Sequence, residues 1–169
     1  MPVFIALLRA INVGGTGKLP MSDLRSLCEK VGFRNVRTYI ASGNVVAEWD
    51  GSEAEVKAVL EAELGAYAGK PVGVIVRTGA EMSKVVANNP FPDRAASQTV
   101  AIFLDLAPPP DVLKDVKGQA NEELRLGARE IYVHYADGIG RSKLRIPAAG
   151  DGTARNMNTV AKLAAMAAE

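Results

Sequence analysis

Two hairpin patterns, one in each half of the chain, most constrain the fold. Val36–Ile40 and Val45–Trp49 are strand-like and flank Ser42-Gly43-Asn44, where Gly and Asn tolerate a positive φ. Glu122–Leu126 and Glu130–Tyr135 flank a glycine-containing turn in the same way. Adjacent antiparallel strands are joined by short turns and need no crossover helix. The two patterns therefore predict antiparallel sheets and disfavour an uninterrupted doubly wound parallel sheet.

The segments around the first hairpin predict alternating strands and helices. Ser52 and Glu55 form a capping-box pattern, and Thr78 and Glu81 repeat it, so a helix is expected to begin at each. The helix that begins at Ser52 is expected to end near Gly65, whereas Pro90 ends the one that begins at Thr78. The remaining expected elements are a strand over Val3–Arg9, a helix from Pro20 to about Gly32, and a strand over Val72–Val76.

After residue 98 a similar order of elements begins again. The expected elements are a strand over Thr99–Leu104, a short helical stretch over Asp111–Val116, the second hairpin, a loop over residues 136–155, and a closing helix from about Asn158. Two successive β-α-β-β-α units fit this order, and each is the kernel of a ferredoxin-like α/β plait. The prediction is an α+β fold made by duplication, with plait-like halves at residues 1–90 and 98–169 and a linker at 91–97.

Composition excludes several functional classes. Twenty Lys and Arg against nineteen Asp and Glu give a net charge of +1, so no whole-molecule field attracts nucleic acid or anionic lipid. One Cys and one His exclude an intrachain disulfide framework and leave too few soft ligands for a zinc site, so no metal and no cofactor is predicted. Neither a leader sequence nor a membrane-length apolar run is present, and a cytoplasmic location without membrane contact is expected.

The glycine-rich segment Gly14-Gly15-Thr16-Gly17-Lys18 resembles a phosphate-binding loop but does not match its motif. Asn12 stands where the first glycine belongs, and Leu19 replaces the hydroxyl residue that would hold magnesium. Nucleotide hydrolysis at this loop is therefore disfavoured. Two interpretations stay open: a flexible strand-to-helix connection, or a generic anion seat formed by exposed amides and Lys18.

A second basic region follows the second hairpin. Arg141, Ser142 and Lys143 lie in a loop with Arg145, and Thr153-Ala154-Arg155-Asn156 precedes the closing helix. Arginine forks, a lysine and a helix N-terminus are the groups that bind phosphate or carboxylate. The alternative is a solvated surface in which Asn156 or Asn158 caps the helix.

No catalytic arrangement is recognisable. Cys28 lies on the apolar stripe of the first helix, which indicates a core thiol, and His134 lacks a neighbouring nucleophile. The aromatic residues are scattered and no RNA-binding signature is present, which disfavours nucleic acid as a partner. Whether the protein is an enzyme stays open at this point.

Several motifs in the same order resemble the bacterial domain-of-unknown-function family numbered 1697, over essentially the whole chain. They are Leu7-Leu8-Arg9-Ala10-Ile11-Asn12-Val13-Gly14-Gly15, Thr38-Tyr39-Ile40-Ala41-Ser42-Gly43-Asn44-Val45, Asn89-Pro90-Phe91, Gly140-Arg141-Ser142-Lys143 and Thr153-Ala154-Arg155-Asn156-Met157-Asn158-Thr159. The resemblance implies two plait-like halves and no assigned activity. Its polar pattern falls on Arg9, Asn12, Ser42, Asn44, Arg141, Ser142, Lys143, Thr153, Arg155 and Asn156.

Together these observations predict binding of an anionic small molecule, phosphorylated or nucleotide-like, in a cationic cleft between the halves. Ser42, Asn44 and Thr153 are secondary members of the predicted site, because a tight turn uses such residues for its own hydrogen bonds. The main alternative is a structural or protein-interaction module without a small-molecule site, and a weaker one is nucleic-acid binding. The sequence leaves the ligand and the oligomeric state undetermined.

Overall fold

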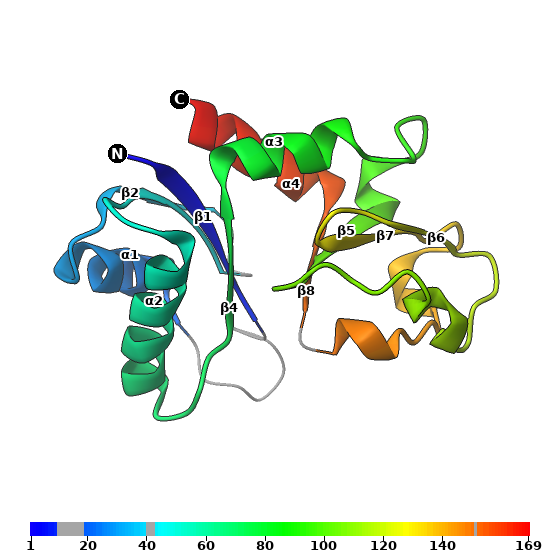
Figure 1. Cartoon of the computed structure of the whole chain (residues 1–169), viewed down its shortest axis with the longest axis horizontal. Coiled ribbons are helices and arrows are strands. Elements are labelled where there is room, and N and C mark those ends of the chain that lie inside the picture. Colours follow the sequence, from blue (N-terminus) through cyan, green and yellow to red (C-terminus); the bar gives the residue numbers. More distant parts are fainter. Residues whose placement is uncertain (10–18, 40–42, 151) are drawn as a thin grey trace. The chain divides into compact units, whose positions relative to one another are not determined.

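A computed structural model describes all of the 169-residue chain except residues 10–18, 40–42 and 151. It contains two four-stranded antiparallel sheets and α-helices that follow or cover their strands (Figure 1). The strands are β1 Val3–Leu8, β2 Arg34–Thr38, β3 Asn44–Glu48, β4 Val74–Thr78, β5 Thr99–Phe103, β6 Glu123–Leu126, β7 Glu130–His134 and β8 Thr153–Asn156. The α-helices are α1 Met21–Lys30, α2 Glu53–Ala68, α3 Gly79–Ala87 and α4 Met157–Ala168.

The chain divides into two compact units. The first contains Met1–Ser83 together with Leu163–Glu169, and the second contains Lys84–Lys162. One boundary falls within α3 and the other within α4. The first unit is therefore built from two separate stretches of sequence.

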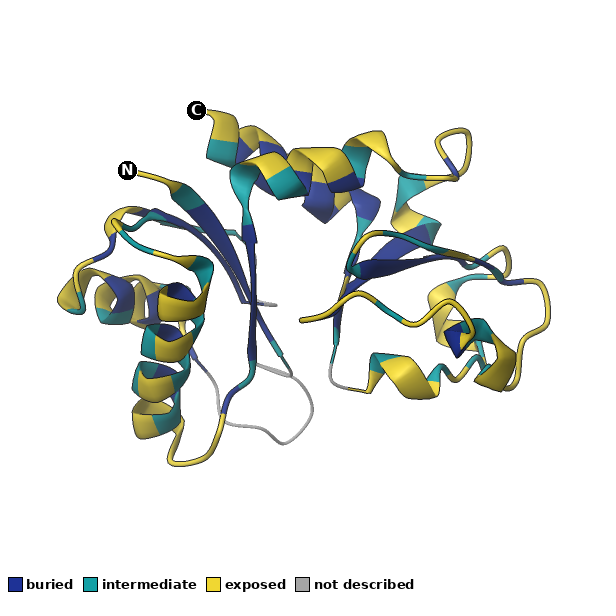
Figure 2. Ribbon diagram, viewed as in Figure 1, coloured by how far each residue is buried: buried dark blue, intermediate teal, exposed yellow. Residues whose placement is uncertain are grey.

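The first unit holds the sheet of order β2-β3-β1-β4, in which every neighbouring pair is antiparallel. Successive side chains of a strand point to opposite faces. Phe4, Ala6 and Leu8 of β1 join the buried cluster that α1 and α2 cover, whereas Ile5 and Leu7 belong to the other face. All five are apolar and buried, so β1 is buried on both faces, and Figure 2 colours this strand mostly as buried.

Helix α2 begins as predicted and ends later than predicted. The Ser52 hydroxyl accepts a hydrogen bond from the Glu55 amide and the Glu55 carboxylate accepts one from Ser52, which confirms the capping box. The helix runs past the predicted end near Gly65 as far as Ala68, and Gly69 takes the left-handed conformation at φ 70°. Gly65 is a helical residue whose carbonyl accepts the Gly69 amide.

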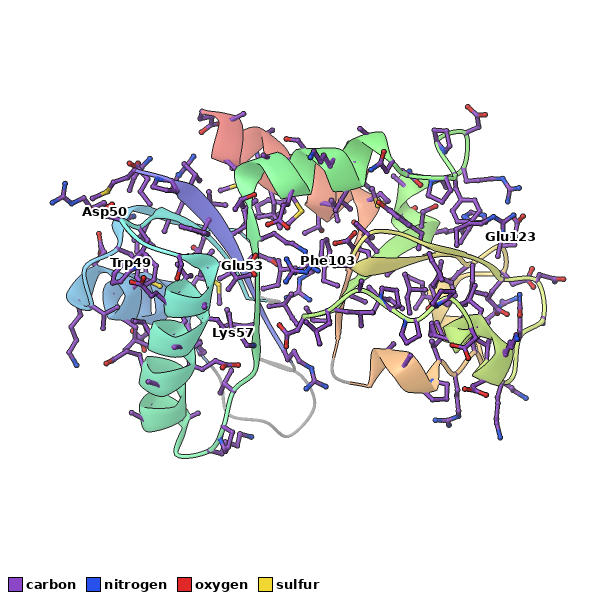
Figure 3. All side chains as sticks on the ribbon, viewed as in Figure 1. Trp49, Asp50, Glu53, Lys57, Phe103 and Glu123 are labelled. Atoms are coloured by element: carbon purple, nitrogen blue, oxygen red, sulfur yellow. The ribbon has the colours of Figure 1, made fainter. Side chains whose placement is uncertain are left out.

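An ion pair on α2 provides hydrogen-bond partners for the backbone of Val74 at the outer edge of β4. Lys57 Nζ lies 3.1 Å from the Glu61 carboxylate and donates to the Val74 carbonyl at 2.6 Å, while the Val74 amide donates to Glu61 at 3.1 Å (Figure 3 labels Lys57). β4 has a strand neighbour on one side alone within the described sheet. The two side chains therefore take the place of a further strand at Val74.

The second unit repeats the strand order of the first as β6-β7-β5-β8. Its fourth strand, β8, begins at Thr153 inside the predicted loop over residues 136–155, so the end of that loop prediction is wrong. Thr153–Asn156 is polar and lacks apolar alternation, but it pairs with β5, where Ala101 faces Arg155 and Val100 faces Asn156. Tertiary pairing thus overrides the local pattern.

The core of the second unit has a different cover. Val100, Ile102, Ile131 and Val133 form one buried face of the sheet. The 3-10 helix Val112–Asp115, where a short helical stretch was predicted, and a loop segment lie against this face. The residues that pack there from these segments are Val112, Leu113, Val116, Leu144, Ile146 and Ala149.

Helices α3 and α4 each start directly after the last strand of a sheet. The Thr78 hydroxyl accepts the Glu81 amide and the Glu81 carboxylate accepts the Thr78 amide, so the second predicted capping box is confirmed. Helix α4 starts at Met157, one residue before the predicted Asn158. Asn156 caps it, since its side-chain oxygen accepts the Thr159 amide at 2.9 Å.

Candidate functional site

Arg155 is the predicted site residue with the most unusual environment. It lies on β8 with 8% of its surface exposed, opposite Ala101 of β5. Its Nη1 donates to the Thr153 hydroxyl at 2.7 Å and to the Ala154 carbonyl at 3.0 Å. Burial lowers the pKa of Arg155 to about 10, because desolvation disfavours a charged side chain. The guanidinium is therefore held against the strand in a desolvated position.

Thr153, Arg155 and Asn156 come together at the end of β8. Thr153 is buried beside Arg155, since residues two apart on a strand share a face. Asn156 follows directly and caps α4, so the positive end of the helix dipole, at Met157, comes two residues after Arg155. These three predicted residues form one local group of a buried cation, a hydroxyl and a helix start.

The predicted loop residues have a different environment. The Ser142 hydroxyl donates to the Glu122 carboxylate at 2.9 Å and accepts the Leu144 amide at 3.1 Å. Hydrogen bonds from the Ala120 amide and from Ser142 lower the pKa of Glu122. Ser142 thus orders the loop, whereas Arg141 and Lys143 on either side of it are exposed.

The second sheet separates these two groups of candidates. Arg155 shares a face with Ala101 and Tyr132, because directly paired residues point to the same side. The loop that carries Arg141 and Lys143 packs through Leu144 and Ile146 against the opposite, apolar face. The structure therefore does not bring Arg155 and this loop together on one face of the sheet.

The candidates of the first unit are only partly described. Asn12, Lys18 and Ser42 lie outside the described residues. Arg9 follows β1, is half-buried, and its amide donates to the Gly73 carbonyl at 2.9 Å. Asn44 is fully buried and its side-chain amide donates to the Tyr39 carbonyl at 2.8 Å, which is a turn-forming role. Arg9 and Arg155 belong to different units, and the single cleft stays a prediction.

Sequence reasoning missed Arg77, which occupies the position in the first sheet that Arg155 occupies in the second. Arg77 pairs with Ile5 of β1, has no exposed surface, and donates from Nη1 to the Val76 carbonyl at 3.0 Å. Each arginine is followed by the residue that caps the next helix, Thr78 or Asn156. The signal in the sequence is an arginine directly before a helix-capping residue at a strand end.

The environments of Cys28 and His134 do not form a nucleophile–base arrangement. Cys28 has no exposed surface, and burial raises the pKa of its thiol to about 12, so it is a core residue as predicted. His134 Nδ1 lies 3.0 Å from the Thr99 hydroxyl, which itself donates to the Ala95 carbonyl. Among the described residues, no group of three or more His, Cys, Asp and Glu side chains is placed to hold a metal ion.

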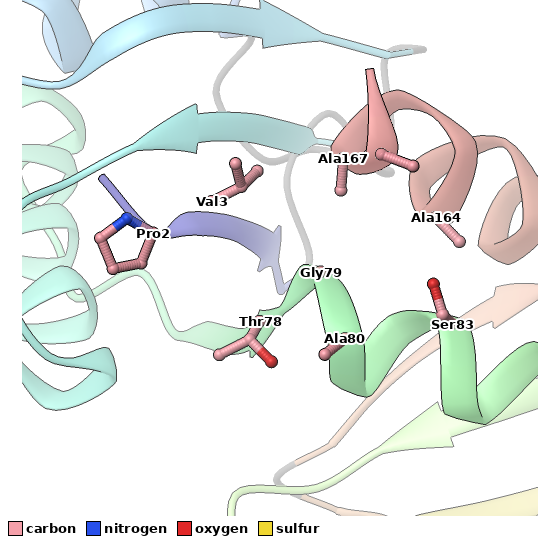
Figure 4. Close-up of a pocket in the computed structure, with 9 residues that line it drawn as sticks. Pro2, Val3, Thr78, Gly79, Ala80, Ser83, Ala164 and Ala167 are labelled. Carbon is pink, nitrogen blue, oxygen red and sulfur yellow. The ribbon is translucent and has the colours of Figure 1, made fainter.

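A hollow of about 370 Å³ lies in the first unit, between the start of α3 and the end of α4 (Figure 4). Its walls are mostly small side chains, including Gly79, Ala80, Ala164 and Ala167. None of the predicted site residues lines it. In the part of the chain that the structure describes, no helix is long and apolar enough to cross a membrane.

The fold defines an α+β protein of the plait type, with two sheets of the same strand order. The chain belongs to the family described as a protein of unknown function (DUF1697), whose model matches residues 1–132, and the resemblance seen in the motifs is confirmed. The structure of conserved bacterial protein SP0830 from Streptococcus pneumoniae is similar, with 22% identity, 98% of each chain covered and a TM-score of 0.80. At this identity the likeness shows the fold. No curated protein matches the chain.

Proposed function

We propose that this protein binds an anionic small molecule, a phosphorylated metabolite or a nucleotide, through Arg155 at the end of β8. The observation that carries the proposal is the burial of Arg155, a residue with 8% of its surface exposed. A charged group that is out of water gains more from an opposite charge than the same group on the surface does. An oxyanion bound there would offset the desolvation that lowers the pKa of Arg155 to about 10.

The neighbours of Arg155 supply the complementary groups. The Thr153 hydroxyl lies 2.7 Å from Arg155 Nη1 and can also donate a hydrogen bond of its own. The start of α4 at Met157 adds the positive end of a helix dipole. Guanidinium, hydroxyl and helix start together favour a phosphate or a carboxylate over a neutral ligand.

A thermal-shift screen against phosphate, nucleotides, sugar phosphates and polycarboxylates tests the proposal. A ligand at one hundred times its dissociation constant stabilises the folded state by about 2.7 kcal/mol. The shift should be lost in Arg155→Gln and weakened in Arg155→Lys, which keeps the charge but loses the fork. Arg145→Ala is the matched control, because Arg145 is exposed and contributes its backbone groups to the bridge with Lys117.

Arg141→Ala tests whether the exposed loop that carries Arg141 belongs to the proposed site. If Arg141→Ala weakens the same ligand shift as Arg155→Gln does, the loop contributes to the site although it packs on the other face of the sheet. If only the Arg155 variants lose the shift, the site is confined to the end of β8. If no compound in the panel stabilises the wild-type protein, the proposal is abandoned and a protein partner is sought instead.

A further inference from the structure

Arg37, in the first unit, uses only part of its guanidinium in contacts with the protein. It lies on β2 opposite Val46 of β3. Its Nη1 donates to the Met166 carbonyl at 2.7 Å and to the Glu169 carboxylate at 3.0 Å. The Met166 carbonyl lies at the end of α4, where helix carbonyls lack the usual amide donor four residues on, and the Glu169 amide reaches it at 3.4 Å. The bond from Arg37 therefore adds a second, shorter donor and links the last turn of α4 to β2.

The other edge of the same guanidinium is buried. Arg37 Nε and Nη2 have no hydrogen-bond partner within the described ranges of the chain, and neither atom is accessible to solvent. Buried donors in folded proteins are nearly always paired, so this edge needs an explanation. Nε–H and one Nη2–H point in the same direction and form the fork that grips two oxygens of a carboxylate or phosphate.

The ion pair that the structure describes for Arg37 involves a single carboxylate. Glu169 is the carboxylate that pairs with it, and it approaches the Nη1 side. The Glu169 side chain is 65% exposed, against 24% for Arg37, so this pair is partly screened by water. The Nη1 side of the guanidinium is engaged, and the N–H groups of the Nε and Nη2 edge are left to pair with an oxyanion once that edge is uncovered.

We propose that Arg37 binds an oxyanion, the carboxylate or phosphate group of a small molecule, in a bidentate contact along its Nε and Nη2 edge. The site opens when the last turn of α4 moves, since Glu169 follows the helix and helix ends open more readily than helix centres. Glu169 competes with the incoming anion through its negative charge. This site is independent of Arg155, which belongs to the second unit.

The side-chain Nε–H signals of arginine in nitrogen–proton NMR spectra test the site directly. Arg37→Lys removes one signal and so identifies it, and titration of the wild-type protein with inorganic phosphate or with acetate should move that signal in a saturable manner. Arg34→Lys is the matched control, because Arg34 is an exposed arginine on the same strand. The Arg37 signal of this variant should respond to phosphate as in the wild-type protein.

Glu169→Gln sharpens the test. Glutamine keeps an oxygen that can accept from Nη1 but removes the charge, so phosphate should bind about threefold more tightly. The proposal is overturned if the Arg37 signal shows no saturable shift with either anion in both the wild-type and Glu169→Gln proteins. It is also overturned if Arg155→Gln abolishes the shift, because the response would then come from the second unit, whereas loss of binding at Arg155 alone would leave the Arg37 shift intact.

Discussion

The two sheets have the same strand order and different covers. β2-β3-β1-β4 and β6-β7-β5-β8 match strand for strand, and in each the last strand carries a buried arginine directly before a helix cap. One face of the first sheet is covered by α1 and α2, whereas 3-10 turns and a loop cover the equivalent face of the second. The comparison teaches that the pairing of the strands determines the sheet and that quite different segments can bury its apolar face.

The largest expected difference between the halves concerns these covers. Leu60→Ala removes a buried side chain from α2 and should cost about 2–5 kcal/mol of unfolding free energy, because a rigid helix leaves a cavity behind. Leu144→Ala, in the half-buried loop cover of the second sheet, should cost about 1 kcal/mol, since the loop can collapse into the space. Urea denaturation measures both, and equal losses would contradict the proposed difference in rigidity.

The next largest expected difference is the pH at which each half begins to lose stability in alkaline solution. Burial raises the pKa of Cys28 from 9.0 to about 12 and that of Tyr132 from 10.0 to about 12. A raised folded-state pKa means that the folded protein holds the proton longer than the unfolded chain does. The free energy of unfolding therefore has its full value below the unfolded-state pKa and falls as the pH rises from there toward the folded-state pKa of about 12. For Cys28 the fall is about 1 kcal/mol per pH unit.

Denaturant unfolding as a function of pH separates the two contributions. Cys28→Ala should remove the loss that begins near pH 9.0, and Tyr132→Phe should remove the loss that begins near pH 10.0. Tyr132→Phe also loses the bond from the hydroxyl to the Val85 carbonyl, which lowers stability at every pH and does not change the slope. An unchanged slope between about pH 9 and 12 in both variants would show that neither group titrates there.

The smallest expected effect tests whether the halves are equivalent at their helix caps. Thr78→Ala and Asn156→Ala each remove the side-chain acceptor at the start of the helix that follows the sheet. Each should cost about 1 kcal/mol of unfolding free energy, because in each helix the amide three residues after the cap, that of Glu81 or Thr159, loses its acceptor. Thr78→Ser and Asn156→Asp keep an acceptor and serve as controls. A loss confined to one half would break the equivalence.

Much of the fold could be predicted because its signals are local. The capping boxes at Ser52 and Thr78 and both hairpins follow from residues that are close in sequence. The strand β8 could not be predicted, since Thr153–Asn156 has no apolar pattern and is a strand through its pairing with β5. The length of α2 was underestimated at Gly65, because a glycine inside a helix resembles a helix end in sequence.

The sequence indicated which residues group locally in the candidate site, but not on which face of the sheet each one lies. Arg155, Thr153 and Asn156 are adjacent in sequence, so a single motif was enough to group them. The separation of Arg155 from the Arg141 loop depends on which face of the sheet each occupies, and this follows from strand pairing that the sequence does not reveal. Arg77 could have been found from its place directly before the capping residue Thr78, whereas nothing in the sequence around Arg37 indicates that two of its nitrogens are buried.

The discontinuous first unit has a consequence for synthesis on the ribosome. Met1–Ser83 is made early, but Leu163–Glu169, which completes the unit, emerges after the whole second unit. Until then Arg37 lacks the Met166 carbonyl, and Gly79 lacks the neighbouring Ala167 methyl group. The first unit therefore stays incomplete while the second unit is translated and can fold. The second unit is completed before the first, although the first begins earlier in the chain.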